Sequence, residues 1–226
     1  PYANLGLWLT LDDAADQGVA TMLLEMHYDF VIANLGNLDR LTALVIPSKS
    51  CLSPEEADAI NAWSDAGGKL LVFGDGAKST AGDGFALQVG TEYIEPAAYD
   101  IDYTVMKTDL GPNLVTTPFL NTTPGLRTQL SDGEALAMIR EPYFSRTYRT
   151  YSSHLNTPFQ LADSAYPAVV RRGNVIFFAH PFDRIYYHHG MRMHRDLFQG
   201  AIDLLDPVSV LRVQGLPSAG RVSLLK

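Results

Sequence analysis

Apolar and polar residues alternate in blocks along the first third of the chain. Short apolar runs, of the kind buried on both faces of a parallel sheet, occupy residues 5–9, 30–33, 43–46 and 69–73. Ahead of the second run, apolar side chains recur every three or four residues, as in a helix with one buried face: Val19, Met22, Leu23 and Met26. This order of strands and helices predicts a mostly parallel sheet with helices on both faces.

The clearest helix signals lie between the third and fourth of these runs. Ser53 is a helix-capping residue, Pro54 suits the first helical position, and Glu56 completes a capping box. Gly67 and Gly68 permit the left-handed turn that ends a helix. We therefore expect a helix that begins after Ser53 and ends before the strand at 69–73.

The middle of the chain, residues 76–167, is rich in Gly, Pro, Thr, Asp and Tyr. It contains short strand candidates at 103–106 and 135–139, whose order in a sheet the sequence leaves open. A hairpin is predicted over residues 168–179, and an amphipathic helix over 190–205 closes the α/β unit.

Two more strand-like runs follow this helix, at 208–213 and 221–225. Turn-forming residues separate them. We therefore expect an α/β domain over residues 1–207 and a short C-terminal β segment, residues 208–226, which starts a following β domain or serves as a linker.

Three segments carry a family resemblance: Ala-Leu-Val-Ile-Pro at 43–47, Leu-Ser-Pro-Glu-Glu at 52–56 and Ala-Gly-Gly-Lys-Leu-Leu-Val-Phe-Gly at 66–74. Together they resemble the class I glutamine amidotransferase-like fold, and in particular the β-galactosidase trimerisation domain. Further segments are similar to a branch of glycosidase-like proteins that carry such a domain: 132–137, 142–148, 153–158 and 167–180.

The resemblance covers about residues 1–207 and implies a flavodoxin-like, three-layer α/β sandwich with a mostly parallel sheet. It also implies an accessory role. Such domains assemble subunits, commonly as trimers, beside the catalytic TIM barrel of a glycoside hydrolase, and that barrel carries the catalytic carboxylates. Because the chain starts at Pro1, we expect a fragment of such an enzyme with no catalytic residues of its own.

Asp75 and His180 are the candidate residues of the sheet edge. In the amidotransferases that the chain resembles, a cysteine on a strained turn after a central strand is the nucleophile, and a histidine is its base. Asp75 occupies or adjoins that position and cannot perform thiol acyl transfer. His180 would lie at the carboxyl edge of the sheet, where open α/β folds bind ligands. It either binds a ligand there or, as we favour, is a hydrogen-bonded histidine that fixes the turn at Pro181.

A second candidate region combines aromatic and basic side chains within twelve residues, 143–154. Its members are Tyr143, Arg146, Tyr148, Arg149, Tyr151 and His154. Such side chains stack on sugar rings and bind hydroxyl groups, and the same types are enriched in protein interfaces. A subunit or barrel contact, a saccharide contact and ordinary packing all remain open for this region.

Three other histidines do not fit a metal site. His188, His189 and His194 lack the i, i+4 spacing that places two ligands on one helical face, so we expect a solvated start of the helix over 190–205. The segment 74–79 lacks the glycine spacing of a phosphate-binding loop. We expect no metal and no cofactor.

Charge and composition limit the classes of partner and the location that we expect. The formal net charge of −8 disfavours nucleic acid, and no apolar run reaches the roughly 20 residues of a membrane span. A single cysteine, Cys51, favours a cytoplasmic location. Two rival functions remain: a stand-alone hydrolase that uses Asp75 or His180, and a saccharide-binding module that does not assemble.

Overall fold

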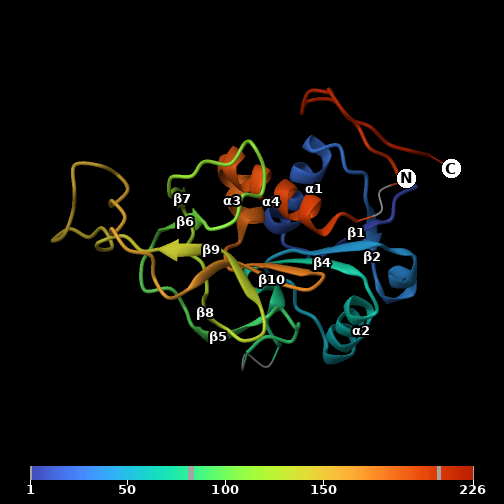
Figure 1. The fold of residues 1–226 in the computed structure, drawn as a ribbon, viewed down its shortest axis with the longest axis horizontal. Coiled ribbons are helices and arrows are strands. Elements are labelled where there is room, and N and C mark those ends of the chain that lie inside the picture. The colour runs from blue at the N-terminus through green and yellow to red at the C-terminus, as the bar shows by residue number, and fades with distance from the viewer. Residues whose placement is uncertain (1, 81–83, 208–209, 226) are drawn as a thin grey trace.

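One mixed sheet of nine strands runs through the protein, of which the structure, a computed structural model, describes residues 2–80, 84–207 and 210–225. Five neighbouring strands at one end are parallel (Figure 1): β2 (Val31–Ala33), β1 (Leu5–Trp8), β3 (Ala43–Ile46), β4 (Lys69–Phe73) and β11 (Val175–Phe178). Nearly every side chain of the last four is buried. Burial of these strands on both faces of the sheet, by the helices described below, explains the continuous apolar runs of the sequence.

Antiparallel strands extend the sheet beyond β11. In spatial order they are β10 (Pro167–Arg172), β9 (Glu134–Arg140), β6 (Asp102–Met106) and β7 (Phe119–Asn121). The β10–β11 hairpin confirms the one predicted, with Gly173 in its turn at φ +55°. A separate two-stranded sheet pairs β5 (Thr91–Glu95) with β8 (Arg127–Leu130).

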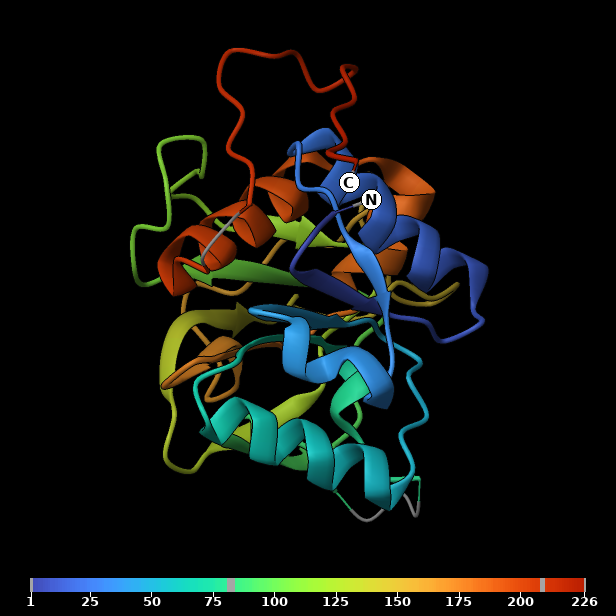
Figure 2. The same cartoon turned by 90° about the vertical axis from the view of Figure 1, so that its right-hand side faces the viewer.

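Helices make the outer layers (Figure 2). One face of the sheet carries α1 (Asp13–Glu25), α3 (Phe182–His189) and α4 (Arg192–Leu205), and the other carries α2 (Pro54–Asp65) and the short 3-10 helix η1 (Leu35–Arg40). A second 3-10 turn, η2 (Gly74–Ala77), follows β4. Phe73, Phe178 and Phe198 pack between sheet and α4, with ring centroids 4.8 Å and 5.1 Å from that of Phe73.

The predicted boundaries of α2 are confirmed. The Ser53 hydroxyl accepts a hydrogen bond from the Glu56 backbone N–H (3.2 Å), and the Glu56 carboxylate accepts one from the Ser53 N–H (2.7 Å). Gly67 takes the left-handed conformation after the helix, at φ +112°. The helix expected over 190–205 is confirmed as α4, which begins at Arg192, whereas α3, which ends just before Gly190 (φ +58°), was not predicted.

The C-terminal segment folds back onto the start of the chain. Residues 210–225 form no strand, although strand-like runs were expected there, and residues 208–209 and 226 lie outside the described part. The Tyr2 N–H donates to the Leu224 carbonyl (2.6 Å), and the Ser223 hydroxyl donates to Asp29 (2.6 Å). Whether this segment begins another domain stays a prediction. Within the described residues, no helix has both the length and the apolar character to cross a bilayer.

Candidate functional site

The carboxyl ends of the parallel strands meet at one edge of the sheet. Open α/β sheets bind ligands at this edge. Lys49 lies on the loop that follows β3, Asp75 on the turn after β4, and His180 two residues after β11. The structure therefore brings the loops of both predicted edge residues to the same side of the sheet.

Asp75 is half-buried and binds Lys49 through two hydrogen bonds. Its carboxylate accepts one hydrogen bond from the Lys49 backbone N–H (3.0 Å) and another from the Lys49 ammonium (2.8 Å). Burial would raise the pKa of Asp75, but the hydrogen bonds and positive charge of Lys49 outweigh it and keep the pKa below its usual value. Lys49 adopts the left-handed conformation at φ +68°, so this ion pair fixes a strained loop.

The strained residue of the turn after β4 is Gly74, at φ +47°. In a nucleophile elbow, a strained turn from strand to helix exposes the reactive side chain. Gly74 has no side chain, and Asp75 beside it is paired with Lys49. Cys51, the single thiol of the chain, lies exposed on the loop between β3 and α2.

His180 belongs to a fully buried polar cluster. Its Nε2 lies 2.7 Å from an Asp102 carboxylate oxygen at the start of β6. Asp102 also accepts hydrogen bonds from the Asn121 side-chain amide (2.8 Å) and the Gly125 backbone N–H (2.8 Å). The Asn121 side-chain nitrogen also lies 3.0 Å from His180 Nε2, so this ring nitrogen faces both a carboxylate acceptor and an amide donor.

His194, on α4, completes the cluster. Its Nε2 lies 2.8 Å from the Asn121 side-chain oxygen, and its ring packs on Phe182 at a centroid distance of 4.6 Å. Burial lowers the pKa of His194 to about 3, so the ring is neutral. The expectation of a solvated histidine is therefore wrong for His194. His188 and His189 are exposed, at the end of α3.

The cluster is closed to solvent. His180, Asn121 and His194 have no exposed surface, and the backbone of Gly125 passes so close that a Cβ there would lie 2.8 Å from His180 Nε2. The neighbouring crevice beside Asp102 has an interior of about 10 Å³, the space of one water molecule at most. The cluster ties α4, β6, β7 and the end of β11 together, with His180 hydrogen-bonded inside it. That His180 fixes the turn at Pro181 stays a prediction.

A second buried carboxylate, Asp183 in the first turn of α3, was not predicted. It accepts hydrogen bonds from the Ser48 N–H (2.6 Å), the Ser48 hydroxyl (2.9 Å) and the Arg184 N–H (2.8 Å). Burial raises its pKa to about 7. Ser48 and Lys49 directly follow a predicted strand, so their place at the edge could have been predicted; that of Asp183 could not, because α3 was missed.

The remaining predicted residues lie together on a loop that projects from the body, residues 141–159 (Figure 1). We name this loop the arm. Tyr143, Arg146, Tyr148 and His154 are all exposed on it, and Tyr148 is 97% exposed. At its base the Tyr143 N–H donates to the Pro158 carbonyl (3.1 Å). Arg149 and Tyr151 are exposed on the arm too, so the predicted residues occupy three settings: an ion pair, a buried cluster and a projecting loop.

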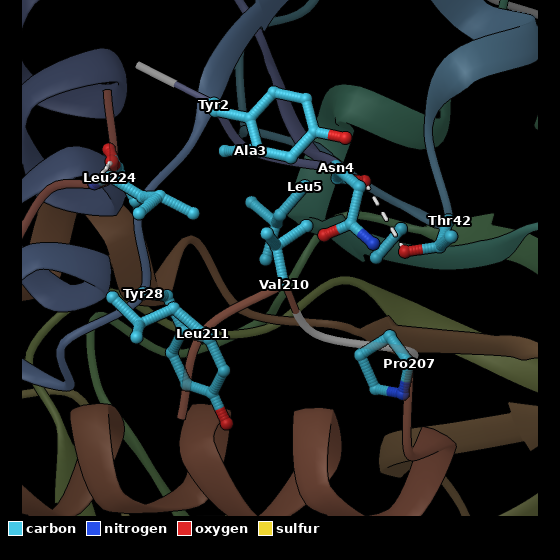
Figure 3. A pocket seen from close by; sticks show the side chains of 12 residues that line it. Tyr2, Ala3, Asn4, Leu5, Tyr28, Thr42, Pro207, Val210, Leu211 and Leu224 are labelled. Carbon is cyan, nitrogen blue, oxygen red and sulfur yellow. Dashed lines mark hydrogen bonds between the residues drawn. The ribbon is translucent and has the colours of Figure 1, made fainter. Parts of the chain in front are cut away.

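A pocket at the opposite edge of the sheet is lined by residues of the chain start and of the C-terminal segment (Figure 3). Tyr2, Asn4 and Leu5 line one side, and Val210 and Leu224 the other. Its interior of about 20 Å³ suits a water molecule and not a sugar. Among the described residues, no group of three or more His, Cys, Asp or Glu side chains could hold a metal ion.

No family model and no curated protein matches this chain. Solved structures do. α-L-Fucosidase isoenzyme 2 from Paenibacillus thiaminolyticus matches with a TM-score of 0.83 and 22% identity over 90% of this chain and 33% of that protein. A β-galactosidase from Rahnella sp. R3 matches with a TM-score of 0.62 and 15% identity over 91% of this chain and 32% of that protein.

A ThuA-like protein from Bacteroides uniformis is also similar, with a TM-score of 0.54 and 14% identity over 88% of this chain and 90% of that protein. The likeness is one of fold. This chain spans about a third of each glycoside hydrolase chain named above, and nearly all of the ThuA-like protein.

Proposed function

We propose that this chain is a non-catalytic accessory domain of a glycoside hydrolase. The observation that carries the proposal is its fold, which recurs at a TM-score of 0.83 as one third of an α-L-fucosidase chain and, more distantly, as about a third of β-galactosidase chains. The sequence motifs at 43–47, 52–56 and 66–74 add their resemblance to the β-galactosidase trimerisation domain.

The strand order supports the finer fold class that we propose, a flavodoxin-like domain of the amidotransferase-like kind. The parallel part of the sheet runs β2-β1-β3-β4-β11, which is the 2-1-3-4-5 order of flavodoxin. In the proposed enzyme the catalytic carboxylates lie on a TIM barrel that packs against this domain. The domain itself self-associates, as a trimer, and works in the cytoplasm.

The chemistry of the sheet edge supports a non-catalytic role. Gly74 provides no nucleophile at the strained turn, and Asp75 is an ion-pair partner of Lys49. His180 could act as a base only if its imidazole reached a substrate, but its ring is fully buried. These three observations weigh against the rival of a stand-alone hydrolase.

Turnover of chromogenic glycosides tests the proposal. This chain alone should hydrolyse none of a panel of α- and β-glycosides, whereas a longer chain that includes the catalytic domain should hydrolyse at least one. Turnover by this chain alone would overturn the proposal if His180→Ala or Asp75→Asn abolished it. Circular dichroism of both variants would show that they still fold.

A further inference from the structure

Among the described residues, the arm is rich in exposed apolar side chains. Four of its large apolar residues are more than half exposed, Tyr143 (55%), Tyr148 (97%), Tyr151 (69%) and Leu155 (77%), and Leu161 (86%) follows just after it. Exposed apolar groups that cluster in this way mark interaction sites in folded proteins. Tyrosine also gives a large contact area for the loss of few rotamers, so it recurs at the centre of protein interfaces.

The arm also differs from the rest of the protein in charge. Apart from Glu141 at its base, which pairs with Arg127, the arm has no Asp or Glu but includes Arg146, Arg149 and His154, in a chain whose formal net charge is −8. Arg146 and Arg149 are both exposed. The arm is therefore a basic, aromatic projection on an acidic molecule, and its natural partner is an acidic surface.

The outer face of α2 is such a surface. Glu55, Asp58, Ala62 and Asp65 follow each other at intervals of three or four residues, so they form one stripe, and all four are exposed. Residues 50–68 include four acidic residues and no Lys or Arg. The opposite side of α2 packs on the sheet through Ala57 and Ile60. The acidic stripe thus faces outward, on a different part of the molecule from the arm (Figures 1 and 2).

We propose that the arm of one copy of this chain docks on the acidic stripe of α2 of a second copy. The inference rests on the self-association proposed above and names the two surfaces that would make it. Because the surfaces differ, the contact is heterologous: each copy presents an arm to one neighbour and a stripe to another. Contacts of this kind close into rings when the rotation between copies allows it, as in a trimer.

The tyrosines and the charges have separate roles in this contact. Exposed ion pairs add little to affinity, so Arg146 and Arg149 would fix the register and the choice of partner. Burial of a tyrosine such as Tyr148 would supply more of the affinity, because tyrosines are enriched among the residues that dominate binding at interfaces. Assembly should therefore weaken in high salt without disappearing.

Charge reversal tests the proposal. The double variant Arg146→Glu/Arg149→Glu repels the stripe, and Asp58→Lys/Asp65→Lys repels the arm. Asp65 lies in the last turn of α2, where a cation is favoured, but it also lies 3.8 Å from Arg172, so circular dichroism should check the fold of this variant. Analytical ultracentrifugation over a concentration series would measure the association constant of each variant, of their combination and of Tyr148→Ser. Arg40→Glu/Arg221→Glu, at exposed positions on other parts of the chain, changes the net charge equally and is the control.

Each reversal should weaken association at least tenfold, the combined variant should regain most of it, and the control should match the original protein. Tyr148→Ser should also weaken association about tenfold. If the original protein is monomeric at every concentration, both the proposed self-association and this inference fail. If it assembles and Arg146→Glu/Arg149→Glu leaves assembly unchanged, this inference alone fails. The arm would then bind a saccharide or contact the catalytic domain instead.

Discussion

Two buried groups, Asp183 and His194, should give this protein opposing dependences of stability on pH. Asp183 has a pKa of about 7 in the folded protein and 3.8 as a free side chain, so the folded state holds the extra proton and stability falls as pH rises between these values. His194 has a pKa of about 3 when folded and 6.5 when free. Here the unfolded state holds the extra proton, so stability falls as pH drops from 6.5 towards 3.

Each group can change the free energy of unfolding by at most about 1.4 kcal/mol per pH unit. Between pH 4.5 and 6.5 the two contributions have opposite signs and should nearly cancel in the original protein. Asp183→Asn removes one of them. The stability of this variant should therefore rise by about 2 kcal/mol from pH 4.5 to 6.5. His194→Gln should show the reverse, a fall of about 2 kcal/mol over the same interval.

Urea unfolding, followed by circular dichroism at half-unit pH steps, measures these profiles. Asp183→Asn should also lose up to about 1–3 kcal/mol, because its amide nitrogen would face the N–H of Ser48 or of Arg184, each of which is a donor. Such a loss lowers the free energy of unfolding but does not change how steeply it depends on pH. Asp58→Asn, at an exposed position, controls for the loss of a carboxylate. Parallel profiles for Asp183→Asn, His194→Gln and the original protein would refute the reasoning.

Two further variants test local packing, both by urea unfolding. Gly125→Ala should cost about 1–3 kcal/mol, because its Cβ would lie 2.8 Å from His180 Nε2 and the bond to Asp102 prevents the ring from moving; an unchanged unfolding midpoint would mean that the cluster is loose. Ser53→Ala should cost about 1 kcal/mol through the lost cap of α2, whereas Ser53→Asp should retain most of the stability.

The parallel half of the fold could be predicted because its signals are local. The apolar runs that became β1, β3 and β4 are buried on both sides, and the cap at Ser53 depends only on the next three residues. The order of the antiparallel strands could not be predicted, since β9 pairs with β6 and β10 through contacts far apart in sequence. No pattern of neighbouring residues in the sequence predicts such pairings.

The buried cluster escaped prediction for the same reason. His180 was recognised as a residue of the sheet edge, but its partner Asp102 begins a strand whose place in the sheet was open, and Asn121 ends a strand that was not predicted. His194 was misread because its polar ring lies on the buried face of α4, where a hydrophobic residue is the usual occupant. Only the hydrogen bond to Asn121 explains its position.

The carboxylates at the sheet edge explain why this edge offers little to a substrate. Asp16 accepts hydrogen bonds from the Thr10 N–H (2.9 Å), the Thr10 hydroxyl (2.8 Å) and the Leu11 N–H (3.0 Å). Asp75 and Asp183 hold the loop after β3 in the same way. Each carboxylate satisfies backbone donors of the chain itself, as buried or half-buried loops require.

A residue that positions its own backbone in this way is a poor candidate for acid–base chemistry, because a proton transfer would break the bonds that hold the loop. The side chains of the arm and of the acidic stripe on α2 are exposed instead. The molecule thus separates an edge whose carboxylates are engaged in internal hydrogen bonds from two exposed surfaces of opposite charge, and the proposed assembly uses only these two surfaces.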